Sequence, residues 1–478
     1  MDAASFQFVL FGLATALVSN FSRSPVWRSN VLLIATIIFL GLLTHHGIQF
    51  LPLAGFLLLG YGGCILAERV GSRSMIWSIS AVLLCYIWLK RYTFLPEVTF
   101  LRFPYLTLGL SYVLFRVLHL LIETADSTQK KHIGLGAYLL YTLNFTTFVS
   151  GPIQRYDEFA KDQFADQPIS LGPRVIGLQL ERIIRGLFKV NVLAMLFNMV
   201  WADALTQILQ PLPSSLKFYA ALRIVIMYPL FLYANFSGYI DIVIALARLM
   251  RLRLPENFNR PFSASSFLGF WERWHITLSA WLKTYVYNPL LLWLMRRMSS
   301  VALQPFLGVF CFFVTFFLVG IWHGRTSEFV IFGVLQGGGV AINKLWQLDL
   351  TRGLGRKRYK ALTANPIYVA FGRGLTFSWF AFTLVWFWAD WAQIDRVFSA
   401  LSVTDWVGVW TATLLLATAV LAGWERLRAT FQSVKASDWP VLTSRYARVV
   451  YATMLGLAAF VMTVLLNQPA PSIVYKAF

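Results

Sequence analysis

His323 is the residue whose type and position most directly suggest chemistry. It lies in the segment 320–325, which reads Gly-Ile-Trp-His-Gly-Arg, directly after the apolar run 301–319 and just before another that begins at Phe329. An ionisable side chain at membrane depth is a functional candidate, and an imidazole exchanges protons near physiological pH. A histidine at a helix end can also merely cap carbonyl groups. The sequence favours the functional role.

His275 is the second candidate, and it lies in an unusual stretch. Within residues 267–294, large aromatic and aliphatic side chains, among them Trp274, recur at helical spacing, while charged residues fall between them. This pattern predicts an amphipathic helix at an interface or beside a protein-lined cavity, and Pro289 limits how far that helix can run unbroken. His275 belongs to the aromatic face, where a hydrogen-bonded interfacial histidine is the alternative to a functional one.

Other polar residues interrupt apolar segments. Ser237 and Asp241 would be costly against lipid, so both should face protein or water. Asp241 and Arg248 are two helical turns apart, and a structural ion pair between them is the alternative to a functional role. The asparagines Asn257 and Asn259 lie in a proline-containing stretch that predicts an ordered turn.

The elements that must position these residues are membrane helices. Of the 478 residues, 58% are hydrophobic and only 13% are charged, which leaves too few polar residues to solvate a globule of this size. A membrane helix needs roughly 20 apolar residues, because the backbone groups can pair only within the helix. Candidate spans lie near residues 5–21, 30–44, 48–67, 76–89, 104–122, 133–150, 183–206, 218–247, 302–321, 328–346, 366–389, 406–424 and 447–467.

The net charge of +20 does not indicate nucleic acid, because the basic residues separate the hydrophobic spans instead of forming one soluble face. Lys and Arg concentrate in cytoplasmic loops, where they also meet anionic membrane lipids. The basic segments 351–361 and 426–445 flank the acidic loop 390–405. We therefore predict that both basic loops are cytoplasmic, and that the acidic loop and the tail 467–478 are external. The first span is expected to be a retained helix.

Small residues in the apolar segments are expected to serve packing. Cys64, Cys85 and Cys311 have no CxxC spacing, and Gly337 to Gly339 lie in an apolar span where close helix packing is the better interpretation. His45 and its neighbour His46 are read as solvated loop residues. The sequence predicts no metal site, no nucleotide-binding loop and no appended soluble catalytic domain.

Several short motifs occur in a fixed order. They are Ser-Gly-Pro-Ile-Gln-Arg at 150–155, Phe-Ser-Gly-Tyr at 236–239, Pro-Glu-Asn-Phe-Asn-Arg-Pro at 255–261, Phe-Trp-Glu-Arg-Trp-His at 270–275 and Trp-His-Gly at 322–324. Together they resemble the bacterial membrane-bound O-acyltransferase (MBOAT) family. The resemblance runs from about residue 105 to 345. The segment 122–126, Ile-Glu-Thr-Ala-Asp, departs from the family's usual sequence and weakens assignment to one subfamily.

The resemblance implies a single integral membrane domain, 1–478, with a catalytic core at 105–345 and C-terminal transmembrane helices at 346–478. It implies a ring of tilted helices around a central tunnel, with amphipathic or re-entrant helices. His323 would be the catalytic histidine and general base on an acceptor hydroxyl, and His275 the second family histidine. Trp322 would wall the tunnel and exclude water. Trp274, Asn257, Asn259, Ser237 and Asp241 are further candidates for the tunnel or core.

The activity implied is transfer of an acyl group across the bacterial cytoplasmic (inner) membrane. The donor would be a thioester, acetyl-CoA or an acylated carrier protein, and no cofactor is bound permanently. Acetylation of an exported polysaccharide, through a periplasmic or extracellular acyltransferase partner, is the leading expectation. D-alanyl transfer or a lipid acceptor is the alternative within this class. A membrane transporter is the alternative from another class, since broken helices with polar residues at mid-membrane occur there too.

Overall fold

The computed structural model describes residues 5–44, 46–125, 132–298, 300–436 and 444–466. His45, Asp126 and the tail 467–478 lie outside the described residues, and so does the side chain of Lys435 in the second basic segment. The described chain is helical apart from turns and loops, and Phe258 and Trp274 form an isolated β-bridge. The predicted all-α polytopic class is therefore confirmed.

Among the described residues, seven helical stretches are long and apolar enough to cross a membrane by length and composition. Three shorter apolar helices lie near the N-terminus, at Phe6–Ser19, Pro25–Gly41 and Arg73–Leu89. The seven stretches are Gly47–Val70, Pro173–Ile208, Ser214–Leu249, Gln304–His323, Ser327–Ala364, Val403–Gln432 and Arg445–Leu466.

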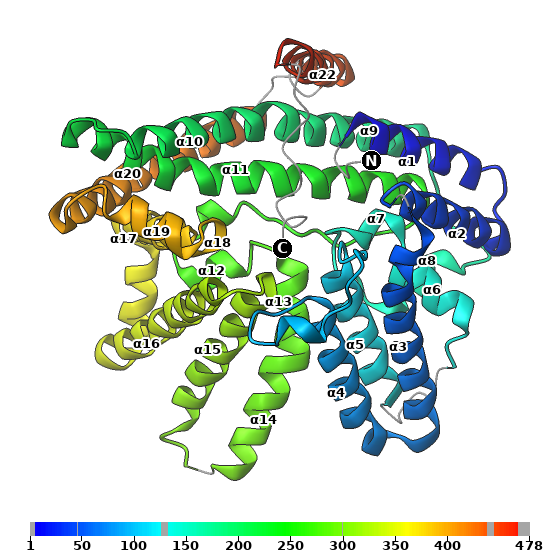
Figure 1. The fold of residues 1–478 in the computed structure, drawn as a ribbon. Helices are drawn as coiled ribbons and strands as arrows, with labels where there is room; N and C mark the ends of the chain where they lie inside the picture. Colours follow the sequence, from blue (N-terminus) through cyan, green and yellow to red (C-terminus); the bar gives the residue numbers. More distant parts are fainter. Residues whose placement is uncertain (1–4, 45, 126–131, 299, 437–443, 467–478) are drawn as a thin grey trace. The chain divides into compact units, whose positions relative to one another are not determined.

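The chain forms two compact units (Figure 1). Unit 1 comprises residues 1–190, 236–256 and 463–478, and unit 2 comprises 191–235 and 257–462. The helices of unit 1 are α1 (Phe6–Ser19), α2 (Pro25–Gly41), η1 (Gly47–Phe50), α3 (Leu51–Val70), α4 (Ser72–Leu89), η2 (Glu97–Thr99), α5 (Leu110–Ala125), α6 (Leu135–Leu143), α7 (Phe145–Phe148), α8 (Tyr156–Gln163) and α9 (Pro173–Phe188).

Three elements contribute residues to both units, namely η3 (Lys189–Ala194), α11 (Ser214–Leu249) and α22 (Arg445–Leu466). The remaining helices belong to unit 2. They are α10 (Met195–Ile208), η4 (Pro261–Ser263), α12 (Phe267–Trp271), α13 (Ile276–Leu282), η5 (Lys283–Tyr287), α14 (Asn288–Arg297), α15 (Gln304–His323), α16 (Ser327–Ala364), α17 (Pro366–Thr383), α18 (Val385–Trp388), α19 (Trp391–Phe398) and α20 (Val403–Ala436).

In unit 1, Asn144 divides the predicted span 133–150 into α6 and α7. Its side-chain oxygen accepts hydrogen bonds from the backbone N–H of Thr146 at 3.1 Å and from the Thr146 hydroxyl at 2.9 Å, which caps the second helix. Arg116 of α5 is buried and donates to the carbonyl oxygens of Thr142 and Thr147. The prediction of one continuous span here was wrong, because a buried cation satisfies the carbonyl groups that the break releases.

In unit 2, α15 and α16 run side by side as a tightly packed hairpin (Figure 1). A Cβ atom on Gly320 would overlap the backbone of Gly333, and one on Gly337 would overlap the carbonyl oxygen of Phe313. Only glycine allows backbones this close. The packing interpretation is confirmed for Gly337, whereas Gly338 faces open space.

Several predictions of local structure were wrong in unit 2. The acidic segment 390–405 is not a loop but contains α19 and the beginning of α20, and the basic segment 426–445 belongs to α20 as far as Ala436. The basic segment 351–361 is not a loop but a continuation of α16, with a kink at Gly355, where φ is 74°. The predicted amphipathic helix 267–294 is divided into α12, α13, η5 and α14. It does not end at Pro289, because the proline occupies the first turn of α14, where its missing N–H is tolerated.

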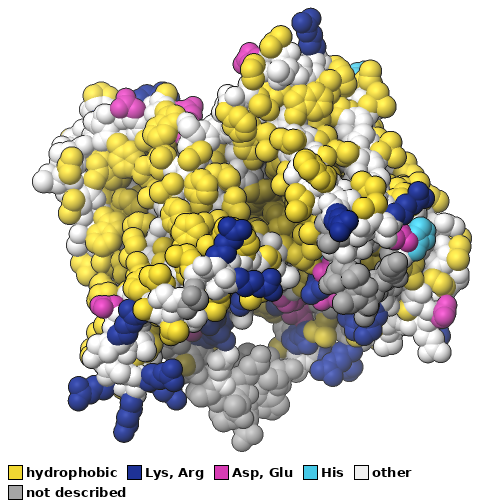
Figure 2. Space-filling model, turned by 90° about the horizontal axis from the view of Figure 1, so that it is seen from below, with side chains coloured by type: hydrophobic (Ala, Val, Ile, Leu, Met, Phe, Trp, Pro, Cys, Tyr) yellow, Lys and Arg dark blue, Asp and Glu magenta, His cyan; other side chains and the backbone are white. Residues whose placement is uncertain are grey.

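Hydrophobic side chains dominate the face shown in Figure 2. Many large apolar side chains are exposed on the predicted spans, for example Leu415 at 64% and Met454 at 65%. A water-soluble protein rarely exposes apolar patches of this extent. The surface therefore fits contact with lipid.

Candidate active site

A sharp turn at His275 separates α12 from α13. His275 has φ 47° and ψ 52°, the left-handed region that a residue with a bulky side chain seldom occupies. The turn is held by pairing with the preceding loop, because Asn259 N–H donates to Arg273 O at 2.9 Å and Ile276 N–H donates to Asn257 O at 3.0 Å. Strained backbone of this kind clusters at functional sites.

Asn257 fixes the orientation of the His275 ring. The Asn257 side-chain oxygen lies 3.2 Å from His275 Nδ1, and it also accepts from the N–H and hydroxyl of Thr277, at 3.1 and 2.8 Å. An amide oxygen can only accept, so Nδ1 carries the proton and Nε2 is the nitrogen with the lone pair. These hydrogen bonds of the Asn257 side chain form a clamp, the Asn257 clamp, which selects one tautomer of His275.

His275 is fully buried, and Asn257 is fully buried with it. Burial lowers the pKa of the His275 imidazole to about 3, because the charged form would lose its hydration. The ring is consequently neutral at physiological pH, which is the state in which Nε2 can accept a hydrogen bond.

The Trp322 ring is a neighbour of both histidine rings. Its ring centroid is 6.4 Å from that of His275 and 4.7 Å from that of His323. The structure thus brings His275, Trp322 and His323 together, although 47 positions separate the histidines in the sequence. A bulky aromatic ring beside both imidazoles restricts water at the site.

His323 is the last residue of α15 and is only 5% exposed. Its ring packs against Phe332 at 6.1 Å and Phe387 at 5.1 Å, centroid to centroid. A Cβ atom on Gly324 would overlap the Phe329 ring, so the chain can leave the helix here only because the next residue is glycine. His323 therefore lies at a tightly packed helix end.

Trp274 and Asn259 support the site instead of facing it. Trp274 is buried, stacks on Phe270 at 5.5 Å and packs against Phe380 at 5.1 Å. The Asn259 side chain is exposed, and its contribution is the backbone hydrogen bond to Arg273. Of the two asparagines in the segment 255–261, Asn257 is the one whose side chain contacts a histidine.

Ser237 and Asp241 belong to unit 1, on the second half of α11. Asp241 pairs with Arg182 at 2.9 Å and with Lys189 at 2.7 Å. The alternative of an ion pair with Arg248 was wrong, because Arg248 donates to the carbonyl oxygen of Ser170 at 3.2 Å. Ser237 is buried.

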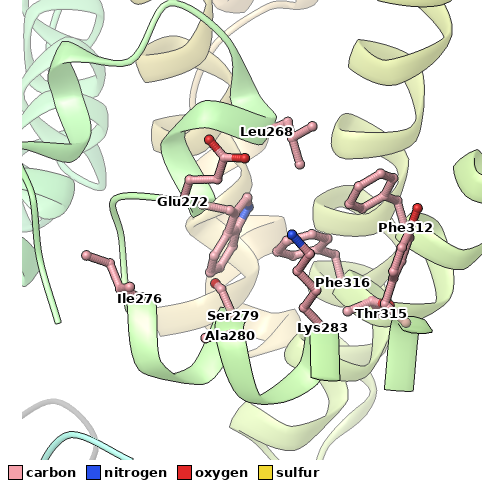
Figure 3. A pocket seen from close by; sticks show the side chains of 11 residues that line it. Leu268, Glu272, Ile276, Ser279, Ala280, Lys283, Phe312, Thr315 and Phe316 are labelled. Carbon is pink, nitrogen blue, oxygen red and sulfur yellow. The ribbon is translucent and has the colours of Figure 1, made fainter. Parts of the chain in front are cut away.

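A hollow of about 230 Å³ lies beside this site within unit 2, between α12, α13, η5 and α15. Figure 3 shows the side chains of Glu272 and Lys283 pointing into it, with Phe312 and Phe316 on the α15 side. The sequence marked Glu272 and Lys283 only as charges on an amphipathic helix. Nothing local distinguishes them from solvated surface charges, because the hollow forms only when the helix breaks at His275.

No group of three His, Cys, Asp or Glu side chains among the described residues could hold a metal ion. The site presents two imidazoles among aromatic side chains, and the Asn257 side chain holds one of them as a neutral tautomer. Such groups can move a proton to and from a hydroxyl or a thiol.

The similarity of this chain to known proteins covers more of the sequence than the short motifs do. The model of the membrane-bound O-acyltransferase family matches residues 72–372. The teichoic acid D-alanyltransferase of Bacillus subtilis is 28% identical over 229 residues, which are 48% of this chain and 56% of that protein. The probable alginate O-acetylase of Azotobacter vinelandii is 26% identical over 323 residues, 66% of this chain and 60% of that protein.

The peptidoglycan O-acetyltransferase of Helicobacter pylori is 32% identical over 213 residues, which are 44% of this chain and 37% of that protein. The chain therefore spans between about a third and two thirds of the length of the relatives it matches. The matched region 72–372 contains both histidines and the turn at His275.

Proposed function

Because the chain belongs to the membrane-bound O-acyltransferase family, we propose that it transfers an acyl group from a cytoplasmic thioester donor toward a hydroxyl acceptor across the membrane. The observation that carries this proposal is the grouping of His275, Trp322 and His323 in one buried site. The clamp from Asn257 adds a histidine of defined tautomer.

In the proposed reaction, His323 is the general base. Its imidazole takes the proton from the acceptor hydroxyl as the oxygen bonds to the thioester carbonyl carbon, and the carbon–sulfur bond breaks. The departing thiolate then takes the proton from His323, so that the enzyme returns to its starting state. His275 Nε2 is placed to accept a hydrogen bond from a hydroxyl and to orient it, while Trp322 limits hydrolysis of the thioester.

We propose acetyl as the transferred group and an exported cell-surface polysaccharide as the final acceptor, reached through a periplasmic or extracellular acyltransferase partner. The names of the alginate and peptidoglycan relatives support an acetyl group and a polymer acceptor. D-alanyl transfer is the second candidate, because the Bacillus subtilis relative carries that activity in its name. The proposed location is the bacterial cytoplasmic (inner) membrane, where membrane lipids surround the chain, and nucleic acid has no part in this function.

Acceptor-dependent cleavage of a thioester by the purified chain tests the proposal. Thiol release from acetyl-CoA and from D-alanyl carrier protein would be followed with and without the envelope fraction that holds the acceptor. Translocation of a solute without acyl transfer would favour a transporter and overturn the proposal. Mass spectrometry of envelope glycans from a strain lacking the chain would identify the acyl group and its carrier.

A further inference from the structure

Several arginines of unit 1 gather around one short segment, residues 162–170 at the end of α8. They come from the turn after α1 and the start of α2, and from the end of α11 and the residues that follow it. Four of them donate hydrogen bonds to this segment, and the fifth, Arg23, is close enough to Arg251 to repel it. We call this group the arginine cluster, and its members are Arg23, Arg28, Arg248, Arg251 and Arg253.

The segment 162–170 holds three of these guanidinium groups through backbone carbonyl oxygens. The hydrogen bonds run from Arg28 to Asp162 O (3.0 Å) and Ala165 O (2.6 Å), from Arg251 to Ile169 O (2.6 Å) and from Arg248 to Ser170 O (3.2 Å). A carbonyl oxygen orients a guanidinium but carries no full negative charge, so these contacts leave the cations without counterions.

The arginine cluster holds more positive charge than its carboxylates neutralise. Asp162 accepts from Arg253 Nε at 3.1 Å, and among the described residues it is the one carboxylate bonded to the cluster. Glu158 adds a weaker attraction to Arg253. Burial and repulsion by its arginine neighbours lower the pKa of the Arg251 guanidinium. Five positive charges therefore face two negative ones.

Two guanidinium nitrogens of the cluster, Arg28 Nε and Arg248 Nη1, are buried without a hydrogen-bond partner in the described part of the chain. Arg28 as a whole is only 2% exposed. Burying charged donors that are not fully paired is unfavourable, and an anion with several acceptor oxygens relieves the cost. A phosphate group is such an anion, and guanidinium groups bind it through paired hydrogen bonds.

Exposed apolar side chains lie next to these cations in the sequence. Phe21 is 70% exposed, Val26 67% and Trp27 39%, and they flank Arg23 and Arg28. Large apolar and tryptophan side chains beside cations are typical of the level of the lipid head groups. Arginines at the ends of spanning helices favour the cytoplasmic side, where anionic lipids attract them. A phosphate bound here would therefore belong to a lipid whose acyl chains contact the apolar side chains.

We propose that the arginine cluster binds the phosphate group of an anionic phospholipid in the cytoplasmic leaflet, and that Arg23 and Arg248 contact this group directly. Arg248 Nη1 is the partnerless donor near the surface end of α11, and Arg23 is exposed and makes no hydrogen bond with a described residue. Arg28 and Arg253 instead hold the segment 162–170 in place. The bound lipid links the start of α2, this segment and the end of α11 within unit 1.

Lipid binding to the purified chain tests the proposal. Delipidated protein in a non-ionic detergent would be titrated with phosphatidylglycerol or with phosphatidylcholine of the same acyl chains, and native mass spectrometry would count the bound lipids. Phosphatidylcholine carries the same phosphate, but its choline group cancels the charge. We expect the first phosphatidylglycerol to bind roughly tenfold more tightly than phosphatidylcholine. Arg23→Gln and Arg248→Gln should each weaken its binding roughly fivefold, because each removes one positive charge beside the head group, and should leave phosphatidylcholine unaffected.

A matched control lies in the same unit but outside the cluster. Arg69→Gln removes an exposed arginine from the end of α3, which packs against α4 and α5, and it should leave both affinities unchanged. Arg248→Lys keeps the positive charge and should retain most of the affinity that Arg248→Gln loses. Thermal unfolding of the lipid-free proteins checks the fold, and Arg23→Gln, which changes an exposed side chain, should unfold at the wild-type temperature.

Equal binding of the two lipids by the wild-type protein would overturn the proposal. So would an equal loss of affinity in Arg69→Gln, because the surface charge in general would then attract the lipid. Inorganic phosphate separates a lipid head group from a free anion. At matched ionic strength, sodium phosphate should displace phosphatidylglycerol no more than sodium chloride does, and stronger displacement would assign the cluster to free phosphate and refute the lipid. None of these measurements depends on acyl transfer, so their outcome is independent of the proposed function.

Discussion

Replacement of His323 is the most direct test of the proposed chemistry, and the structure decides which replacement to use. His323 is 5% exposed and packs against the rings of Trp322, Phe332 and Phe387. His323→Ala would leave a cavity among these rings and cost about 2–4 kcal/mol of folding free energy, by analogy with other large-to-small core substitutions. Loss of activity in that variant would therefore be ambiguous.

His323→Gln preserves most of the volume and a hydrogen-bonding group but removes the base. We expect it to lower kcat about 10²–10⁴-fold, the usual contribution of a general base, while its thermal unfolding stays close to that of the wild type. The assay is acceptor-dependent thiol release at equal membrane abundance, with thermal unfolding measured on the same preparations. His323→Ala should lose comparable activity and unfold at a lower temperature.

Near-normal turnover by a well-folded His323→Gln variant would refute the proposed role, because glutamine cannot take a proton at physiological pH. The site would then need a base other than His323. Loss of turnover in His323→Gln together with unfolding as early as that of His323→Ala would show that the histidine is needed mainly for packing.

The other predictions concern the clamp, the hairpin and the topology. Asn257→Asp places a carboxylate beside His275 and raises the pKa of that imidazole, so the ring protonates as the pH falls through the raised value. The acid limb of the kcat–pH profile should therefore move to higher pH. An unchanged acid limb would contradict the contact between Asn257 and His275. Gly320→Ala should destabilise the protein by about 1–3 kcal/mol through overlap with the facing helix, as measured by thermal unfolding, whereas the matched Gly338→Ala should not. Cysteines introduced at 351–361 should be labelled only from the cytoplasmic side. Labelling of these cysteines from outside intact cells would show that the predicted orientation is wrong.

The membrane class of this protein could be predicted from the sequence because hydropathy is a property of consecutive residues. A composition of 58% hydrophobic residues with periodic apolar runs leaves only lipid as a solvent. The candidate histidines were visible for the same reason, since His323 follows an apolar run and lies in a short motif. The ordered motifs indicated the family, which the match over residues 72–372 confirms.

Helix boundaries were harder to predict from the sequence where contacts with distant segments determine them. The basic segment 351–361 continues α16, because charged residues are good helix formers once they leave the apolar part of the helix. The span 133–150 breaks at Asn144, where Arg116 from another helix takes up carbonyl groups. The break at Asn144 is therefore not encoded within that segment alone.

The arrangement of the site was decided by tertiary structure alone. A histidine in left-handed conformation gives no sequence signal, yet the turn at His275 ends α12, pairs with the loop at Asn257 and sets the tautomer of the ring. The same turn opens the hollow into which Glu272 and Lys283 point. Sequence determined which side chains were available in the membrane. Which of these side chains meet was decided by the folding together of segments that are far apart in the chain. Hydrogen bonding and packing act over a few ångströms in space and not along the sequence.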